Sequence, residues 1–531
     1  MSPLALSYWP ADASETVLDL TIAGILRHAA DTVPDRVALV AGVHEPELRT
    51  RRTYAQLRDE AERVGHALST RFEPGERVAA WAPSIPESLV LSFAAAMARL
   101  VLVPVNPALR EDETRHILES SGAAGIFLVP EHRGNDLAGI LERIRPHLPA
   151  LREVVDFEDW SSFTSTPPTR PLPPPQPDDV AQIIFTSGTT GAPKGAMLTH
   201  RGMCNAARVA GIRFGIVPGD VYVMTIPLFH TGGQGVSFEI CQGLATNVLV
   251  RQFDPGLQLE LLETERATLT VGVPTMLLAI IEHPDFGHRD VRALRTVSSG
   301  GAVVPADLIR HIEATLHVQS TIVFGQTEAC GFISQTHLDD APEDKAETLG
   351  QLLPRIEGRV VDPDTGFVVP IGEVGELQIR GFNLMAGYHG EPAATAAAID
   401  AEGWLHTGDL TTMDARGFLR IAGRLKDMVV TGGVNVFPAE IERAIGEHPA
   451  VAQVAVIGRP DRQWGEAVVA VVRLAPDHVA DASELDEFAR ARLARHKVPK
   501  EWVFVDELPT NASGKVQKFI LREQLDSGRG A

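Results

Sequence analysis

The sequence has little cysteine and no long uninterrupted apolar run. Its 531 residues include three cysteines, too few and too scattered for a disulfide framework or a zinc site: Cys204, Cys241 and Cys330. No apolar run approaches the roughly 18 residues of a transmembrane helix, and the first ten residues lack the basic and apolar regions of a signal peptide. We therefore expect a cytoplasmic protein with reduced thiols and no transmembrane segment.

The chain is also poor in basic residues relative to acidic ones. It carries 48 Lys and Arg residues against 69 Asp and Glu residues, which gives a formal net charge of −21. Proteins that bind nucleic acid need a basic surface, so this balance argues against a nucleic-acid partner. An anionic small molecule would have to be bound locally, by loop N–H groups and a few basic side chains.

The first part of the chain alternates between two kinds of segment. A chain of this length should hold about two to four domains. Helical spacing of apolar residues predicts helices, and short apolar runs between them predict strands. The expected helices are 21–30, 57–68 (behind a capping box of Thr53 and Gln56), 87–98 and 111–120, and the expected strands are 77–81, 100–105 and 125–129. This alternation predicts an α/β layered subdomain around a parallel sheet.

The same pattern then recurs, and the texture changes after residue 350. A second α/β layer is predicted from strands at 221–226, 245–250, 269–271 and 296–298 and helices at 257–265, 275–281 and 305–315. Short strands and turns over 350–420 predict a small β-rich subdomain. A separate small α+β domain is predicted in the tail from helices at 438–446 and 483–495 and strands at 451–457, 467–472 and 503–505.

A proline-rich segment, residues 165–178, precedes the chemically most informative stretch. It predicts a stiff extended connector, although such composition also occurs in recognition motifs for small domains. Residues 185–195 follow, with the sequence FTSGTTGAPKG. We expect a loop between the strand at 180–185 and the helix at 200–212. Its backbone N–H groups, hydroxyls and Lys194 suit phosphate, but a Gly/Ser/Thr run is also typical of an ordinary surface loop.

Further motifs carry groups that suit nucleotide chemistry. His230 lies in PLFHTGG at the end of a strand-like run, where α/β sheets bind ligands, although a lone histidine is often structural. We expect the small residues at 231, 232, 233 and 235 to leave space beside it. Glu328, in FGQTEAC, is a candidate Mg²⁺ ligand, since Mg²⁺ prefers carboxylate and phosphate oxygens. Taken alone, it would more often be a surface carboxylate.

Together these stretches resemble the adenylate-forming superfamily, which includes acyl-CoA synthetases, peptide-synthetase adenylation domains and luciferases. The resemblance covers roughly residues 20–525, with the motifs in family order. They are residues 185–195, 227–233, 298–302, 324–330, 404–409, 423–428 and 509–515. The pattern is most similar to acyl-CoA synthetases of the fatty-acid type. The resemblance implies a large N-terminal domain at 1–423, a hinge at 424–427 and a small mobile C-terminal domain at 428–531.

The resemblance also implies a role for each motif residue. Lys515, His230 and Lys194 would be catalytic, Glu328 would bind Mg²⁺, Lys426 would be the hinge, and Gly432 and Gly433 would line the coenzyme A tunnel. ATP or AMP would contact Thr186, Ser187, Gly188, Thr189, Thr190, Gly191, Gly300, Gly301, Ala302, Phe324, Gly325, Gln326, Thr327, Asp409 and Arg424. The acyl pocket would include His230, Thr231, Gly232, Gly235, Ser299, Gly325 and Cys330.

The implied reaction joins a carboxylic acid to coenzyme A through acyl-AMP, with ATP and Mg²⁺. Amino-acid-activating relatives place an Asp near position 230, so His230 argues against an α-amino acid. The neutral pocket residues favour a medium- or long-chain fatty acid, with an aryl or cyclic acid as the alternative. An acyl-AMP ligase that loads a carrier protein, a luciferase-like oxidase and a non-catalytic nucleotide-binding relative remain open, as does a homodimer.

Overall fold

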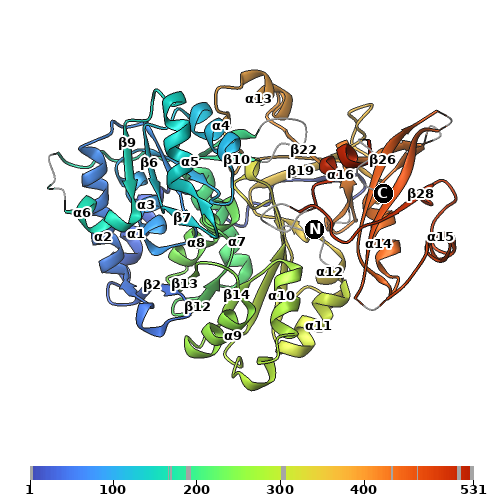
Figure 1. Ribbon diagram of the computed structural model, residues 1–531, viewed down its shortest axis with the longest axis horizontal. Helices are drawn as coiled ribbons and strands as arrows, with labels where there is room; N and C mark the ends of the chain where they lie inside the picture. The colour runs from blue at the N-terminus through green and yellow to red at the C-terminus, as the bar shows by residue number, and fades with distance from the viewer. Residues whose placement is uncertain are drawn as a thin grey trace. The chain divides into compact units, whose positions relative to one another are not determined.

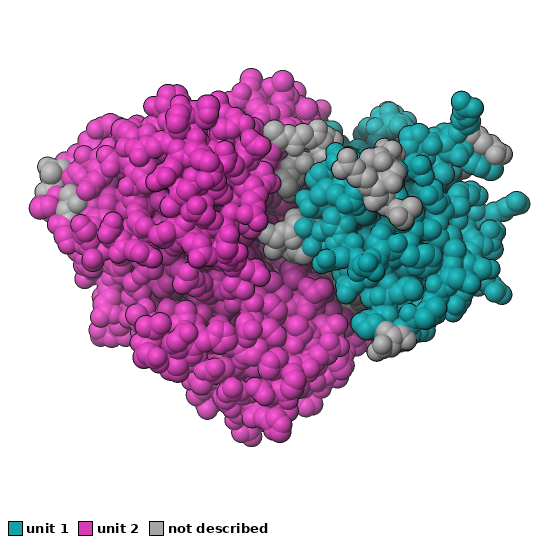
Figure 2. Space-filling model, viewed as in Figure 1, with its two compact units in different colours: residues 1–8, 359–378, 406–531 teal, residues 9–358, 379–405 magenta. Residues whose placement is uncertain are grey.

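The computed structural model describes residues 4–165, 167, 170–186, 193–300, 306–431, 434–462, 464–476, 478–510 and 516–526. The chain divides into two compact units, coloured separately in Figure 2. Unit 1 comprises residues 1–8, 359–378 and 406–531, and unit 2 comprises residues 9–358 and 379–405. This division does not test the hinge predicted at 424–427, which stays a prediction.

The first layer of unit 2 is a seven-stranded sheet with the strand order β21-β11-β10-β5-β4-β6-β9. Figure 1 labels its strands β10, β6 and β9. Strands β5, β4, β6 and β9 run parallel, as predicted. In sheet order, the strands are Gly387–Tyr388, Lys194–Thr199, Val180–Thr186, Val101–Val105, Arg77–Trp81, Gly125–Leu128 and Glu153–Asp156. The helices of this region are α1 (Ile22–Thr32), α2 (Tyr54–Ser69), α3 (Pro86–Met97), α4 (Glu111–Ser121), α5 (Leu137–Ile144) and α6 (Trp160–Thr164).

The capping box predicted at the start of α2 is confirmed. The Thr53 hydroxyl accepts from the Gln56 N–H, and the Gln56 side chain accepts from the Thr53 N–H. Two orphan donors of the first helical turn are satisfied in this way. The apolar positions that follow, including Leu57, Ala61 and Val64, are buried. Local sequence therefore sets both the start of this helix and the face that it buries.

The second layer of unit 2 is a nine-stranded sheet with the order β18-β17-β16-β15-β14-β12-β13-β2-β3. In sheet order, these strands are Gln351–Leu352, Ser334–Gln335, Gln319–Phe324, Thr296–Gly300, Leu269–Val271, Val221–Met224, Thr246–Val250, Val37–Gly42 and Arg51–Thr53. The run from β16 to β2 is parallel. The helices are α7 (His200–Phe214), α8 (Thr231–Gln242), α9 (Pro255–Thr264), α10 (Pro274–Ile281), α11 (Ala306–Leu316) and α12 (Pro342–Glu347). Helix α13 (Pro392–Ala398) instead contacts β21 of the first sheet.

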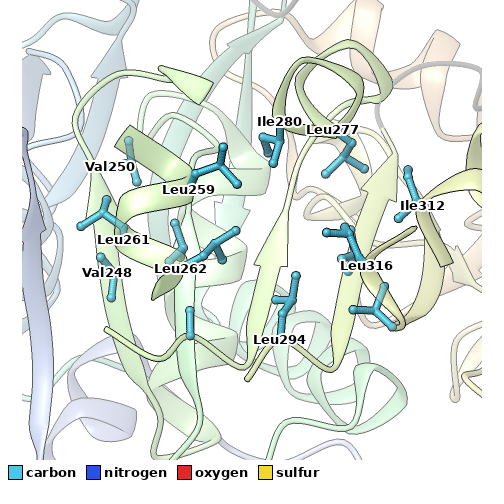
Figure 3. Close-up of a cluster of buried hydrophobic side chains, with 14 of the residues drawn as sticks. Val248, Val250, Leu259, Leu261, Leu262, Leu277, Ile280, Leu294, Ile312 and Leu316 are labelled. Atoms are coloured by element: carbon cyan, nitrogen blue, oxygen red, sulfur yellow. The ribbon is translucent and has the colours of Figure 1, made fainter. Parts of the chain in front are cut away.

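The core of this second layer lies between the sheet and helices α9, α10 and α11. Figure 3 shows Leu259 and Leu262 of α9 on the side of the sheet where Leu277 of α10 and Leu316 of α11 also lie. Burial of such side chains stabilises the fold by roughly 1.5–3 kcal/mol each. This packing fixes the ends of β12, β15 and β16, from which the predicted motifs emerge.

Two expectations about unit 2 are wrong. Residues 194–199 form strand β11, antiparallel to β10, so the predicted phosphate loop joins two strands rather than a strand and a helix. The pairing of Phe185 with Gly195 was hidden because each half of this hairpin is too short to show its own periodicity. The strand predicted at 296–298 also continues for two more residues, because β15 pairs with β16 as far as Gly300.

Unit 1 contains most of a five-stranded sheet with the order β1-β19-β20-β22-β23. These strands are Tyr8–Trp9, Ile356–Val361, Gly375–Gly381, Leu405–Met413 and Leu419–Arg424. They confirm the β-rich region predicted for 350–420. The short strands β7 (Glu131–His132) and β8 (Asn135–Asp136) form a separate hairpin in unit 2.

The tail of unit 1 has its own sheet and core, as predicted. Its sheet has the order β25-β24-β27-β26, with β28 beside β27. These strands are Val434–Val436, Val429–Thr431, Gly465–Leu474, Val451–Asp461 and Glu501–Phe504, and the helices are α14 (Pro438–Gly446), α15 (Ala482–Arg490) and α16 (Lys518–Asp526). Helix α15 ends five residues before the predicted residue 495, and α16 was not predicted.

The sequence predicts no transmembrane segment and no disulfide framework. No helix among the described residues is long and apolar enough to cross a membrane. The three cysteines are free and buried. Burial raises the pKa of Cys241 and of Cys330 to about 12, so both thiols are protonated at neutral pH.

Candidate functional site

A tight turn follows strand β16 and carries the predicted magnesium ligand. Thr327–Ala329 form a single 3₁₀ turn, and Cys330 and Gly331 follow with left-handed backbones at φ 53° and 88°. A Cβ on Gly325 would lie 2.0 Å from the Gly331 carbonyl oxygen, so only glycine permits this approach. The turn therefore presents Glu328 from a backbone with little freedom, which suits a residue that must hold one position.

Glu328 is joined to the phosphate-loop hairpin by a residue that the sequence did not reveal. The Tyr388 hydroxyl donates a 2.8 Å hydrogen bond to Glu328 Oε1. The Lys194 ammonium lies 5.3 Å from the centroid of the same Tyr388 ring. Two predicted site residues that are 134 positions apart in the sequence thus meet on one side chain. Tyr388 lies outside the motifs quoted above, and only its strand pairing reveals its place.

Helix α8 brings the predicted histidine motif to the same turn. Thr231 Oγ1 donates to Thr327 Oγ1 over 3.1 Å. His230 is the N-cap of α8, and its Nδ1 accepts from the Gly232 N–H at 3.2 Å. An Nδ1 that accepts leaves Nε2 as the protonated ring nitrogen in the neutral tautomer. The ring is therefore fixed in this structure, although α8 itself was not predicted.

The space next to the glycines near His230 is occupied by other groups of the protein. A Cβ on Gly233 would lie 2.1 Å from the Pro227 carbonyl oxygen, and one on Gly235 would lie 2.5 Å from the ring of Phe332. The expectation that these small residues leave empty space is therefore wrong at both positions. They are small because a backbone and an aromatic ring pack directly against them. Phe332, which is buried, becomes a further candidate pocket residue.

Two motif residues of unit 2 hold buried polar atoms without a partner among the described residues. These atoms are the Ser299 hydroxyl on β15 and Gln326 Nε2 in the turn after β16. A buried polar group that lacks a hydrogen bond costs roughly 1–3 kcal/mol. Groups of this kind are expected at a site that a polar ligand completes.

The remaining described site residues lie in unit 1. Asp409 on β22 faces Arg424 on β23, with Arg424 Nε 2.8 Å from Asp409 Oδ1. The Asp409 side chain is 3% exposed, so its charge is held by a buried ion pair. Lys426 lies in the 3₁₀ turn Leu425–Asp427, and Arg522 of α16 donates to Asp427 at 3.2 Å. Asp409 and Arg424, both predicted to contact the nucleotide, are thus brought together within unit 1.

Asp409→Asn tests this pair. Hydrogen bonds to charged groups contribute about 1.5–3 kcal/mol, so the loss of the carboxylate should raise the KM for ATP by about 10-fold or more. Initial rates across an ATP series give this value. Glu501→Gln is the control, because Glu501 also pairs with an arginine of unit 1, Arg459, at 3.0 Å. Equal KM values for both variants would contradict a nucleotide role for Asp409.

Ten predicted site residues lie outside the described residues. They are Ser187, Gly188, Thr189, Thr190, Gly191, Gly301, Ala302, Gly432, Gly433 and Lys515. Their roles stay predictions. Thr186, at the end of β10, is described, and its hydroxyl donates to the Lys194 carbonyl oxygen at 3.5 Å across the hairpin.

The chain matches two known families in sequence. Residues 26–389 match the AMP-binding enzyme family, and residues 440–515 match the AMP-binding enzyme C-terminal domain. The chain belongs to the AMP-binding enzyme family. The first match covers well over half of the chain and includes the turn of Glu328, the phosphate-loop hairpin and Tyr388.

Relatives of this AMP-binding enzyme are ligases that form acyl-CoA. It is 32% identical to the mitochondrial medium-chain acyl-CoA ligase ACSF2 of Macaca fascicularis, over 98% of this chain and 90% of that one. It is 35% identical to a 3-(7a-methyl-1,5-dioxo-octahydroindenyl)propanoyl:CoA ligase of Rhodococcus jostii, whose named acyl group bears a ring system. That match covers 89% of this chain and 94% of the relative. The AMP-binding enzyme described here is therefore an AMP-forming acyl-CoA ligase.

A solved structure supports the α/β fold of this AMP-binding enzyme. The ATP-bound MatB from Rhodopseudomonas palustris superimposes with a TM-score of 0.84 at 30% identity, covering 94% of this chain and 98% of that one. The expected large N-terminal domain and small C-terminal domain are confirmed as a fold class.

Proposed function

We propose that this enzyme activates a fatty acid with Mg·ATP to form acyl-AMP, and then transfers the acyl group to the thiol of coenzyme A. The observation that supports this most is the meeting of Lys194, Glu328 and Tyr388 beside the phosphate-loop hairpin. A cation and a carboxylate that contact the same tyrosine side chain suit a nucleotide triphosphate with its magnesium ion. ATP in the related MatB structure supports the same assignment.

The residues around Glu328 fit a magnesium ion that phosphate also binds. Among the described residues, no group of three or more His, Cys, Asp or Glu side chains could hold a metal ion by itself. Mg²⁺ in phosphoryl-transfer sites is commonly held by one or two carboxylates plus the phosphates, so a single glutamate is sufficient. Tyr388 donates to Oε1, so Oε2 would be available to bind the ion. Bound there, Mg²⁺ would neutralise charge on the phosphates.

The other residues of the site supply positioning and charge. Lys194, at the start of β11, would bind the outer phosphates, and Thr327 would donate to the α-phosphate. The carboxylate of the acid attacks that phosphorus, and pyrophosphate leaves. Lys515 would offset the repulsion between the two anions, and Lys426 would act as the hinge for the second step. Substitution of Lys426 should therefore impair thioester formation more than adenylation.

We favour a medium- or long-chain fatty acid as the substrate. ACSF2, at 32% identity, is named for medium-chain acids. The residues that we assign to the acyl pocket also include no Asp, Glu, Lys or Arg; they include Thr231, Gly235, Ser299, Cys330 and Phe332. The Rhodococcus relative, at 35%, is named for a ring-bearing acid, so a cyclic acid is the second candidate.

A substrate panel tests the proposal. Pyrophosphate release and AMP formation are measured with Mg·ATP across fatty, aryl and cyclic acids, each with and without coenzyme A. Turnover of fatty acids that requires coenzyme A and yields a thioester would support the proposal. A single burst of pyrophosphate that coenzyme A leaves unchanged would point instead to a carrier protein as the acyl acceptor.

Phe332→Leu should change which acids are accepted. The Phe332 ring fills the volume beside Gly235, so a smaller side chain should raise kcat/KM for cyclic acids about 10-fold relative to linear ones. Rates on octanoate and on cyclohexane carboxylate measure the ratio. The control is Phe238→Leu, since Phe238 lies on α8 like Gly235 but packs on Phe93, with ring centroids 5.9 Å apart. An unchanged ratio would remove Phe332 from the acyl pocket.

A further inference from the structure

Residues 383–389, here called the bridging segment, connect the two halves of the candidate site in unit 2. The segment follows strand β20 and includes strand β21. Its sequence, NLMAGYH, carries no carboxylate and no Lys or Arg. Nothing in its composition indicates a catalytic role, and its importance comes from the two elements that it contacts.

On one side, the bridging segment holds the turn that carries Glu328. The Asn383 side chain is fully buried and donates to the carbonyl oxygens of Ala329, at 3.3 Å, and Phe332, at 2.9 Å. The Met385 N–H donates to the Glu328 carbonyl oxygen at 2.8 Å. Three hydrogen bonds therefore fix the backbone of the turn from one side.

On the other side, the segment pairs with the phosphate-loop hairpin. Strand β21 is antiparallel to β11, with Gly387 opposite Met197 and Tyr388 opposite Ala196. The His389 N–H donates to the Gly195 carbonyl oxygen at 2.8 Å, directly after Lys194. The segment thus sets the spacing between the hairpin and the turn by main-chain bonds.

Among the described residues, Tyr388 is the one side chain of the segment that contacts a charged group of each element. Its hydroxyl donates to Glu328 Oε1, and Lys194 lies over its ring. The hydroxyl is the donor of this hydrogen bond, because an ionised carboxylate can only accept. The Tyr388 N–H donates to Thr395 Oγ1 at 2.8 Å, which anchors the residue from α13.

We propose that Tyr388 is a positioning residue that orients the Glu328 carboxylate for the magnesium ion of the nucleotide and supports the Lys194 side chain over its ring. This inference rests on the proposed function, since it takes Glu328 as the metal ligand. A carboxylate with one oxygen fixed by a hydroxyl has less rotational freedom to lose when it binds the ion. Tyr388 itself contacts neither the acid nor the α-phosphate in this role.

The test separates the hydroxyl from the ring. Tyr388→Phe removes the hydrogen bond and keeps the ring under Lys194, whereas Tyr388→Leu removes both. For Tyr388→Phe we expect the Mg²⁺ concentration at half-saturation to rise about 10-fold, with kcat at saturating Mg²⁺ within about threefold of the wild type, in line with second-shell substitutions. For Tyr388→Leu we expect an additional rise in the dissociation constant of ATP.

Binding is measured as well as turnover, so that the proposal does not depend on activity. ATP binding is followed by calorimetry across a Mg²⁺ series, and acyl-AMP formation by pyrophosphate release. Tyr54→Phe is the matched control, because the buried Tyr54 hydroxyl donates to the Ala245 carbonyl oxygen at 2.7 Å. It should lower the melting temperature and leave the Mg²⁺ requirement unchanged, which separates lost stability from lost positioning.

Each outcome decides the proposal. An Mg²⁺ requirement that rises in Tyr388→Phe and not in Tyr54→Phe supports it. An unchanged requirement, or a fall in kcat that excess Mg²⁺ does not restore, overturns it. If the wild type binds Mg·ATP but activates no acid, the proposed function fails and the binding series still decides the role of Tyr388. If the dissociation constant of ATP for the wild type does not change with Mg²⁺ concentration, the inference about Tyr388 is overturned.

Discussion

Lys515→Ala is expected to lower the rate of acyl-AMP formation by about 10²–10³-fold. The attack of a carboxylate on the α-phosphate brings two anions together, and a positioned cation stabilises the charge that develops there. The loss of one such group usually costs about this much in rate. Pyrophosphate release in single turnovers measures the step directly. Lys515 was assigned from its motif alone, so this variant is the decisive test of that assignment.

The second half-reaction supplies the internal control for Lys515. Thioester formation from supplied acyl-AMP should stay largely intact in Lys515→Ala, because that step no longer involves the triphosphate. Lys518→Ala is the matched variant, since Lys518 lies three positions away and pairs with Glu442 at 2.6 Å. It should retain adenylation. An equal loss of both half-reactions in Lys515→Ala would contradict a role confined to adenylation.

The layered fold could be predicted from the sequence because its signals are local. The capping box at Thr53 and the buried face of α2 depend on residues within a few turns of one another. The parallel strands β4, β5 and β6 are short apolar runs between helices, which is the signature of an α/β layer. The predicted tail domain likewise has its own compact core.

The pairing of short strands could not be predicted, since it depends on distant residues. Residues 194–199 form strand β11 because they pair with β10 and with β21, which lies almost 200 positions later in the sequence. The six residues of β11 show no clear alternation by themselves. The phosphate loop was therefore placed before a helix, when it belongs to a hairpin.

The sequence predicted which residues belong to the candidate site better than it predicted which groups those residues contact. Asp409 and Arg424 were each assigned to the nucleotide, and the structure pairs them at 2.8 Å. Gly233 and Gly235 were taken to leave room, but a sequence does not show which group packs against a missing side chain. Tyr388 was missed for the same reason, because its importance comes from Glu328 and Lys194, far away in the sequence.

Glu328→Gln should lower acyl-AMP formation by about 10²–10³-fold, because it removes the charge that, in the proposed function, would hold the magnesium ion near the phosphates. The amide oxygen of glutamine can still accept the Tyr388 hydroxyl, so the local packing is retained and only the charge is lost. Pyrophosphate release at low and high Mg²⁺ measures the effect, and excess Mg²⁺ should not restore the rate. Glu313→Gln is the control, since Glu313 pairs with Lys345 at 2.9 Å and should affect stability only.

Combining the two changes gives the sharpest test of how Glu328 and Tyr388 act. If Tyr388 works through the Glu328 carboxylate, Tyr388→Phe should raise the Mg²⁺ requirement in the wild-type background and change nothing further in Glu328→Gln. Contacting residues show this kind of non-additivity, with coupling of roughly 0.5–3 kcal/mol in a double-mutant cycle. Additive losses would mean that the two residues act independently. The 2.8 Å bond would then be a structural contact rather than part of the metal site.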